Sequence, residues 1–241
     1  MDKSTLLPSP RAQFWRGARD TFPLLVGALP FGIIFGALAV TSGLSAQGAA
    51  AMSAFVFAGS AQFIAVGLVA AGTPFFIIWL TTFVVNARHI LYSAIIAPNL
   101  EGLPARWLVP LGFWLTDESF MVAAKNFEEE AKNPHKNWYL LGSEIVMYLN
   151  WQGVTAIGIG AGRSIPNPAS WGLDYALVVT FIGMLVPMVK GKPMMAAVLV
   201  AGSTAVLANG LPYQSGLLLA AIFGIAAGVV AERAWPKKTK T

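Results

Sequence analysis

Residues 75–97 of the chain read FFIIWLTTFVVNARHILYSAIIA, an apolar run about as long as a bilayer is thick, with the tetrapeptide Asn86-Ala87-Arg88-His89 near its centre. An arginine at membrane depth is costly, and it persists only where a counter-charge, a water-filled cavity or a ligand compensates it. The run therefore predicts a membrane helix that carries a polar site inside the bilayer.

The composition extends this prediction to the whole chain. Hydrophobic residues make up 56% of the 241 residues and charged residues only 11%, whereas soluble domains have about 25% charged residues. The chain has no cysteine, which excludes disulfides, thiolate metal sites and thiol catalysis. No metal-ligand spacing or nucleotide-binding motif is present, so we expect an all-α integral membrane protein without a cofactor.

Eight apolar runs predict a polytopic bundle of about seven or eight transmembrane helices. They cover residues 22–41, 49–71, 75–97, 107–124, 138–161, 173–190, 193–209 and 212–231. Seven spans, or six spans plus re-entrant segments, are alternatives, because prolines interrupt the first run and flank the short seventh. Similar glycine spacings in the two halves of the chain hint at an internal repeat, which is common in secondary transporters.

The basic residues predict an orientation. If the amino terminus is cytoplasmic, the inner segments hold 13 of the 16 basic residues, and the outer loops hold only Arg106 and Arg163. The positive-inside rule then places both termini in the cytoplasm. We predict a cytoplasmic amino-terminal segment at residues 1–21, a transmembrane transporter domain at 22–231 and a basic cytoplasmic tail at 232–241.

Pro30, Gly32 and Gly36 mark the first segment of interest. The two glycines form a GxxxG face that lets another helix approach closely, and the proline removes one backbone hydrogen bond. One interpretation is a kinked helix that only packs. The other is a broken helix whose free backbone groups meet a substrate, as in many transporters.

The second segment is Gly59-Ser60-Ala61-Gln62, in the middle of the run 49–71. A serine in a membrane helix usually bonds back to its own backbone, but the amide of Gln62 has no such local outlet. Gln62 should therefore face the bundle interior or a cavity, with space left beside it by Gly59. We predict that Gly59, Ser60 and Gln62 contact a substrate.

The third and fourth segments are the Arg88 tetrapeptide and Asp117-Glu118. Arg88 lies nine residues from the outer end of its run, and Asp117 lies ten residues from the outer end of the next, so the two side chains should lie at similar depth. This predicts an Arg88–Asp117 or an Arg88–Glu118 ion pair, which could be purely structural. As a functional hypothesis, Arg88 binds a substrate carboxylate, Asp117 or Glu118 binds the ammonium group or the coupling proton, and Asn86 completes the polar shell.

A coupling proton also needs a carrier inside the membrane. Glu118 is one candidate, because only one acid is needed to pair with Arg88. His89 is the other, because imidazole titrates near neutral pH. A histidine that only makes a hydrogen bond is the alternative interpretation.

These segments together resemble the AzlC-type branched-chain amino-acid permeases. The matching stretches are ALPFGIIFG at 28–36, FAGSAQF at 57–63, NARHILY at 86–92, LTDESF at 115–120 and GLDYA at 172–176. The resemblance implies an inner-membrane transporter that exports valine, leucine and isoleucine, with methionine as a further candidate substrate. It also implies a much smaller membrane partner subunit of AzlD type.

Three alternatives stay open beside proton-driven export. An uncoupled channel is compatible with proline-broken spans, and uptake is compatible with every residue named above. An intramembrane hydrolase built on Ser60 and His89 is disfavoured, because the sequence has no nucleophile elbow. We therefore expect a transporter and no enzymatic activity.

Overall fold

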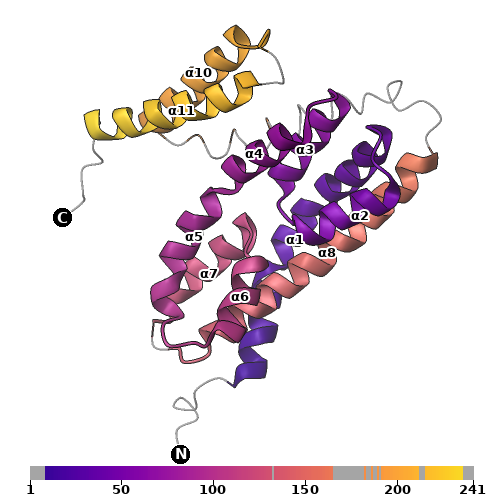
Figure 1. Cartoon of the computed structure of the whole chain (residues 1–241). Helices are drawn as coiled ribbons and strands as arrows, with labels where there is room; N and C mark the ends of the chain where they lie inside the picture. The colour runs from indigo at the N-terminus through magenta and orange to yellow at the C-terminus, as the bar shows by residue number, and fades with distance from the viewer. Residues whose placement is uncertain are drawn as a thin grey trace, which may run out of the picture. The chain divides into compact units, whose positions relative to one another are not determined.

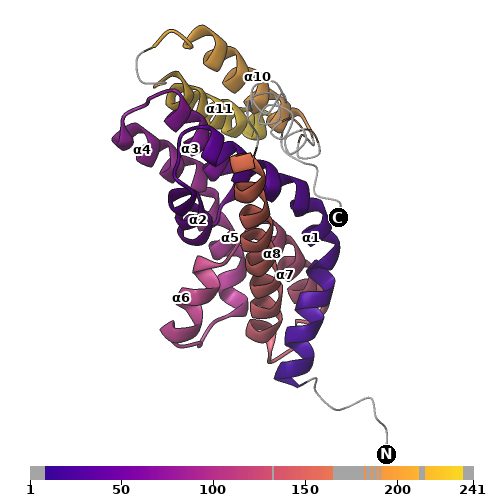
Figure 2. The same ribbon diagram turned by 90° about the vertical axis from the view of Figure 1, so that its right-hand side faces the viewer.

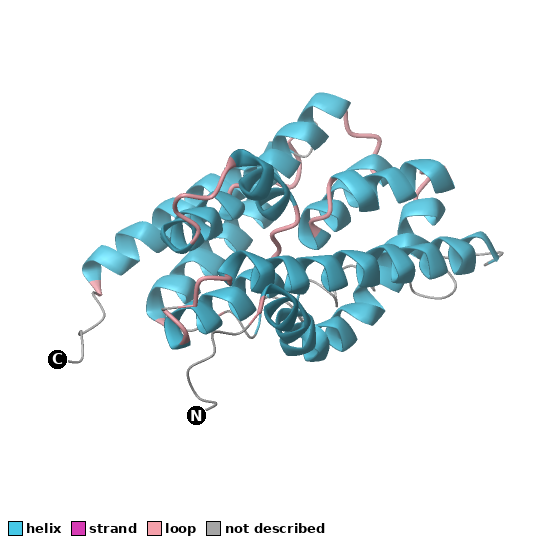
Figure 3. Ribbon diagram, turned by 90° about the horizontal axis from the view of Figure 1, so that it is seen from below, coloured by secondary structure: helices cyan, strands magenta, loops and turns pink. Residues whose placement is uncertain are grey.

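The computed structural model describes residues 9–131, 133–164, 182, 186, 189, 191–211 and 215–235, and every regular element in this part of the chain is a helix (Figure 1, Figure 3). The chain divides into two compact units. The first holds Met1–Gln62 and Asn86–Pro168, and the second holds Phe63–Val85 and Ala169–Thr241. Most of the predicted span 173–190 lies outside the described residues, as does most of the tail 232–241.

The described part of the first unit contains seven α-helices or parts of them and a short 3-10 helix. They are α1 (Pro10–Thr41), α2 (Ala46–Phe55), the start of α3 (Gly59–Ala70), α5 (Arg88–Ile96), the 3-10 helix η2 (Ala97–Asn99), α6 (Ala105–Phe113), α7 (Asp117–Glu129) and α8 (Lys136–Ser164). The described part of the second unit contains the rest of α3, α4 (Phe75–Asn86), α10 (Lys192–Leu207) and α11 (Ser215–Ala234). Two described helical stretches, Pro10–Thr41 and Phe75–Asn99, are long and apolar enough to cross a membrane.

Helices α1 and α8 form the central packed pair of the first unit and run side by side in the same direction (Figure 2). Near their starts, Thr21 Oγ1 donates a hydrogen bond to Ser143 Oγ at 2.6 Å. Near their ends, Gly36 lies against Gly158 so closely that a side chain on either would collide with the opposite backbone. Small residues at the crossing thus allow the close approach that holds helices together in lipid.

The predicted helix break at Pro30 is wrong. Helix α1 continues without interruption through Pro23 and Pro30. Gly32 and Gly36 both face α8, where Gly32 meets Val154. The structure therefore supports the interpretation of this segment as a packing helix.

Helix α6 lies along the first part of α8. The Trp107 and Trp138 rings lie 5.0 Å apart between centroids, and the Trp114 and Tyr148 rings lie 5.8 Å apart. Ten residues of α8 separate the two contacts, which corresponds to about 15 Å along a helix. This distance is about half the thickness of a bilayer core, which is about 30 Å.

Helix α7 returns to the end where α6 began, so α6 and α7 form a helical hairpin. Lys136, the first residue of α8, lies over the Phe127 ring near the end of α7, at 5.4 Å from its centroid. Arg16 of α1 forms an ion pair with Glu130, just after α7. The prediction that residues 107–124 form one crossing helix is therefore wrong, and this segment matches the re-entrant alternative.

The same contacts correct the predicted position of the loop around Asn99 and Arg106. Lys136 Nζ donates a hydrogen bond to Asn99 Oδ1 at 2.8 Å, so this loop lies beside the predicted inner segment 125–137. We call this end of the unit, formed by residues 10–20, 97–106 and 125–138, the basic end. Its described basic residues are Arg11, Arg16, Arg19, Arg106, Lys125 and Lys136. The opposite end, formed by residues 41–46 and 159–164, has only Arg163 among its described residues.

Helix α2 approaches the middle of α8 from the opposite end. Gln152 Nε2 donates a hydrogen bond to the Ser53 carbonyl at 3.0 Å, and the Phe57 ring lies edge-on to Tyr148 at 4.9 Å. Tyr148 thus contacts both the end of α2 and the end of α6. Two half-length helices that start at opposite ends of the unit meet at this residue.

In the second unit, α10 and α11 form an antiparallel helical hairpin. Gly216, at the start of α11, lies against Ala208, just after the end of α10. Gly228 lies near Pro193 and Ala197 at the start of α10. These helices coincide with the predicted spans 193–209 and 212–231 to within three residues.

The position of the Asn99 loop gives a prediction about accessibility. The chain has no cysteine, so single cysteines are clean reporters. Glu101→Cys and Glu129→Cys should react with a membrane-impermeant thiol reagent from the same face of the membrane, and Ser164→Cys from the other. Labelling of right-side-out and inside-out vesicles measures this. Reaction of Glu101→Cys together with Ser164→Cys would instead support a crossing helix at 107–124.

The contact between α1 and α8 gives a prediction about stability. Gly36→Ala should lower the stability of the folded protein by about 1–3 kcal/mol, because the methyl group collides with α8 backbone. Gly27→Ala, in the same helix with open space around it, should be neutral or stabilising by up to about 1 kcal/mol. Thermal unfolding of the purified variants in detergent compares them. Equal melting temperatures would contradict the close contact.

Candidate functional site

The polar motifs of the sequence coincide with breaks between helices. The predicted span 49–71 is interrupted at residues 56–58 and the span 107–124 at residues 114–116, whereas the span 75–97 has only a turn at Ala87, whose backbone stays helical. The sequence predicted helices broken by proline or glycine, but neither residue stands at these positions. Breaks at membrane depth free backbone groups, and these are tolerated only where protein, water or a ligand covers them.

A capping box forms the break between α6 and α7. The Thr116 backbone N–H donates to Ser119 Oγ at 2.8 Å, and the Ser119 N–H donates to Thr116 Oγ1 at 3.3 Å. These two bonds satisfy backbone groups that would otherwise be stranded at the start of α7. Asp117 and Glu118 follow in the first turn, where negative charge complements the helix dipole.

The break between α2 and α3 depends on an unusual backbone conformation and a small residue. Phe57 has a φ of 41°, which is costly for a residue with a side chain. A side chain on Gly59 would begin only 3.3 Å from the Trp151 ring, so glycine lets α3 start against α8. Ser60 is thereby placed one residue into the helix.

Arg88 connects its own helix with the two chain segments that follow the breaks. Its Nη1 lies 3.1 Å from Asp117 Oδ2 at the start of α7, and its Nη2 donates a hydrogen bond to Ser60 Oγ at 2.6 Å at the start of α3. Arg88 itself opens α5. The exposed fractions of the Arg88 and Asp117 side chains are 25% and 29%. The structure has the Arg88–Asp117 pair, one of the two pairings predicted, and the hydrogen bond from Arg88 to Ser60 was not predicted.

Several buried polar atoms of the ion pair and of the same chain segments have no hydrogen-bond partner. They are Arg88 Nε, Asp117 Oδ1, Asn86 Oδ1 and both amide atoms of Gln62. Gln62 is fully buried. Buried polar groups in proteins are nearly always hydrogen-bonded, so these atoms mark a place for water or a polar guest. We define Ser60, Gln62, Asn86, Arg88 and Asp117 as the central cluster.

The starts of α3 and α7 both contribute to the central cluster, through Ser60 and Asp117. The first N–H groups of a helix lack intrahelical partners, and the helix dipole makes this end partly positive. Such ends bind anionic groups, including substrate carboxylates in transporters with broken helices. The arrangement therefore offers a carboxylate the α3 start and Arg88, and offers an ammonium group the free oxygen of Asp117.

The remaining predicted residues lie at the edge of the central cluster or outside it. His89 is half-buried, and its ring lies edge-on to Tyr92 at 5.7 Å. Glu118 is half-buried beside Asp117. Gly32, by contrast, belongs to the contact between α1 and α8. Pro30 and Gly36 likewise lie outside the cluster, on α1.

Sequence interpretation missed the roles of three residues on α6 and α8. Tyr148 joins two helix breaks, and the indole N–H of Trp114, beside it, is buried without a partner. Glu144, which lies six residues into the predicted span 138–161, is fully buried, and neither carboxylate oxygen has a partner. A charged residue inside a membrane helix was the available signal for Glu144.

The ion pair gives a prediction about folding. Arg88→Ala and Asp117→Ala should each lower the yield of folded protein, because each leaves a charge without its partner. Removing one member of a fully buried pair costs about 3–5 kcal/mol, and the partial exposure here reduces that cost. The double variant should fold better than either single variant, as judged by size-exclusion chromatography.

A matched control is the exposed pair Lys125–Glu129 on the same helix, where the charged atoms are 3.9 Å apart. Alanine at either of these positions should change the folded yield little, as expected for a surface pair. A double Arg88→Ala, Asp117→Ala variant no better folded than the worse single variant would show that the two residues do not stabilise each other.

Comparisons with known proteins agree with the membrane interpretation. A family profile described as "AzlC protein" matches residues 23–165. A protein of Archaeoglobus fulgidus named "Uncharacterized membrane protein" is 33% identical over 219 residues, which cover 90% of this chain and 94% of that protein. No solved structure matches the chain.

Two further relatives have more specific names. The "Branched-chain amino acid transport protein AzlC" of Bacillus subtilis is 32% identical over 71% of this chain and 68% of that protein. The "Inner membrane protein YgaZ" of Escherichia coli is 28% identical over 78% of this chain and 74% of that protein. Since the family profile covers more than half of its length, the chain belongs to the AzlC family of membrane proteins.

Proposed function

We propose that the protein is a secondary transporter that exports valine, leucine and isoleucine across the cytoplasmic membrane, with methionine as a further substrate. Membership of the AzlC family and the name of the Bacillus subtilis relative support a membrane transporter for branched-chain amino acids. The direction and the substrate range are inferred from the resemblance and from the chemistry of the central cluster.

The observation that supports this proposal is an ion pair in which each residue keeps one buried polar atom without a hydrogen bond. Arg88 and Asp117 satisfy each other through Nη1 and Oδ2, while Arg88 Nε and Asp117 Oδ1 stay without partners. A zwitterionic amino acid carries the same two charges as this pair. It can therefore bind its carboxylate at Arg88 and its ammonium group at Asp117 without leaving either charge stranded in the membrane.

The polar shell around that position is completed by neutral groups. Ser60 already accepts a hydrogen bond from Arg88. Asn86 precedes Arg88 by two residues and Gln62 follows Ser60 by two, and both have buried amide atoms without a partner. Arg88 and Asp117 pair with each other when the site is empty and with the substrate when it is occupied. Such an exchange of partners fits alternating access around a fixed central site. The aromatic and aliphatic residues of the unit would accept the substrate side chain.

Proton coupling requires a titratable group inside the membrane that the ion pair does not occupy. Glu118 and His89 lie beside the central cluster and remain candidates. Glu144 is a third, because its buried carboxyl group has no partner among the described residues. Intramembrane carboxyl groups of this kind commonly carry protons in transporters.

We further propose that both termini are cytoplasmic and that a small membrane subunit of AzlD type assembles with this chain. The orientation is supported by the concentration of basic residues at the basic end. An uncoupled channel and an uptake permease are the alternatives. Flux that saturates with valine and follows an imposed proton gradient distinguishes a coupled carrier from a channel, and its preferred direction distinguishes export from uptake.

Conservative changes in the central cluster test the substrate site. Arg88→Lys keeps the charge but loses the planar fork that grips a carboxylate. Gln62→Leu keeps the volume but loses the amide. Both variants should reach the membrane, and their apparent affinity for valine should fall by about tenfold, which corresponds to about 1.4 kcal/mol. Efflux from valine-loaded cells or proteoliposomes measures the effect.

The matched controls make the same substitutions elsewhere. Arg163→Lys at the opposite end and Gln47→Leu on α2 alter exposed side chains. Each should transport valine like the parent protein. Normal efflux and affinity in both Arg88→Lys and Gln62→Leu, at normal expression, would contradict a substrate site at the central cluster.

A further inference from the structure

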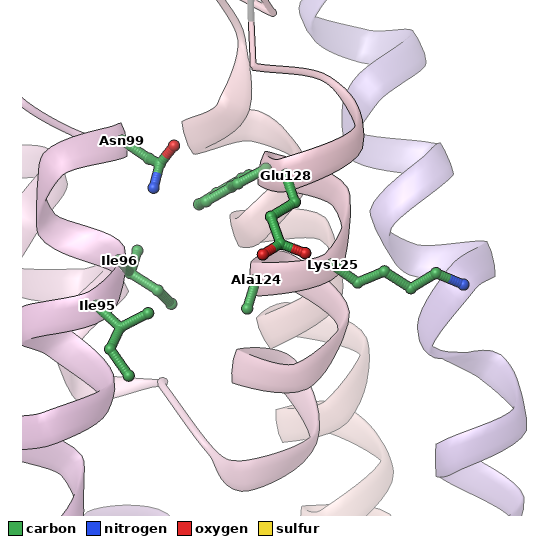
Figure 4. Close-up of a pocket in the computed structure, with 7 residues that line it drawn as sticks. Ile95, Ile96, Asn99, Ala124, Lys125 and Glu128 are labelled. Carbon is green, nitrogen blue, oxygen red and sulfur yellow. The ribbon is translucent and has the colours of Figure 1, made fainter. Parts of the chain in front are cut away.

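A pocket of about 420 Å³ lies towards the basic end of the first unit, between α7 and the segment formed by α5 and η2 (Figure 4). Its lining residues are Ile95, Ile96, Asn99, Ala124, Lys125, Phe127 and Glu128. Figure 4 shows the isoleucines of α5 opposite Ala124 and Glu128 of α7, while the Lys125 side chain extends away. The pocket is thus lined about equally by polar and apolar surface.

The pocket lies along the same two helices as the ion pair. Arg88 and Ile95 are seven residues apart on α5, and Asp117 and Ala124 are seven residues apart on α7. Seven residues are two turns of an α-helix, so both pairs of residues share a helix face and are about 10 Å apart along it. Helices α5 and α7 therefore connect the central cluster with the pocket.

One pair of aromatic residues occupies the turn between these two levels. Tyr92 follows Arg88 by four residues, and Phe120 follows Asp117 by three. Their rings are stacked, with centroids 4.4 Å apart and an angle of 13° between the ring planes. Both rings also pack against the apolar core cluster that includes Ile96 and Phe127 of the pocket.

We propose that the Tyr92–Phe120 pair is a gate that separates the central cluster from the pocket, and that the pocket is the vestibule through which substrate reaches the site from the basic end. This inference rests on the proposed function, because a gate has meaning only on a transport path. A stacked pair is suited to the role, since separating two rings needs only rotation of their side chains.

Tyr92 also links the gate to substrate binding. The side chain of Tyr92 lies close to the carboxylate of Asp117, and its ring stacks on Phe120. A substrate ammonium group at Asp117 would arrive next to the ring that closes the vestibule. Occupancy of the central cluster can therefore displace this ring, which couples binding to opening.

Accessibility of the central cluster tests the gate without any transport measurement. The reporter is a Ser60→Cys variant of the cysteine-free chain. A membrane-impermeant thiol reagent is added to oriented vesicles, at the face where Glu129→Cys reacts. Combining the reporter with Phe120→Ala or Tyr92→Ala should raise its labelling rate by about tenfold, a change of about 1.4 kcal/mol in gate opening. Labelling from the other face should not change.

Two controls separate gating from general loosening. Met121→Ala changes the neighbouring residue of α7, which is 54% exposed, and should leave the labelling rate as it is. Tyr92→Phe retains the stacked ring and should also keep the reporter protected. Phe120→Leu retains an apolar side chain for folding but removes the stacking, and it should label faster than the Met121→Ala control.

The proposal is overturned if the alanine and leucine variants, shown to be folded by size-exclusion chromatography, label no faster than Met121→Ala. It is also overturned if labelling rises equally from both faces, because the pair would then only stabilise the fold. These outcomes do not depend on valine. Failure of valine transport with a positive labelling result would contradict the proposed substrate and leave the gate in place.

Discussion

The ion pair between Arg88 and Asp117 is the interaction on which the first unit depends. A guanidinium group in the middle of an apolar chain must be neutralised within reach of its side chain, and Asp117 does this at 3.1 Å. Ser60 Oγ accepts a hydrogen bond from a second guanidinium nitrogen, Nη2, at 2.6 Å. Each of the three residues lies at or near the start of a different helix, so one side chain holds three chain segments together. The remaining free atoms at the pair make the same interaction suitable for holding a zwitterion.

Broken helices explain how such a pair is presented without unsatisfied backbone. Helix α2 enters from the opposite end and α6 from the basic end, and both end at Tyr148 of α8. The continuous helices α1 and α8 form the rigid support, joined through Gly36 and Gly158. Half-helices can move relative to such a support at lower cost than whole spans, because their ends are already capped or turned. The continuous helices α1 and α8 thus form the fixed support, and the short helices α3, α5 and α7 supply the binding residues Ser60, Arg88 and Asp117.

The positions of apolar helices and the Arg88–Asp117 pair could be predicted from the sequence, because hydropathy and the cost of a buried charge are local properties. The path of the chain between helices could not. The sequence argument treated the runs 75–97 and 107–124 as two antiparallel helices, whereas α7, the second part of the latter run, leads from the ion pair to the basic end as α5 does. The Arg88–Asp117 pair forms nevertheless, because Asp117 lies close to the centre of its run whichever way the run folds. The capping residues Thr116 and Ser119 were the signal for a turn, but their meaning depends on the neighbouring α8. The break at Pro30 was expected from proline alone, and tertiary packing overrode it.

Equilibrium binding to the purified protein tests most directly whether the central cluster is a zwitterion site. Valine, valine amide and isobutyric acid share the branched side chain but present both charges, only the ammonium group or only the carboxylate. If Arg88 and Asp117 bind the two charges, valine should bind saturably, each single-charge analogue should bind at least about tenfold more weakly, a loss of about 1.4 kcal/mol or more, and Arg88→Lys should weaken valine binding. Equal affinity for all three ligands, or valine binding unaffected by Arg88→Lys, would contradict the account.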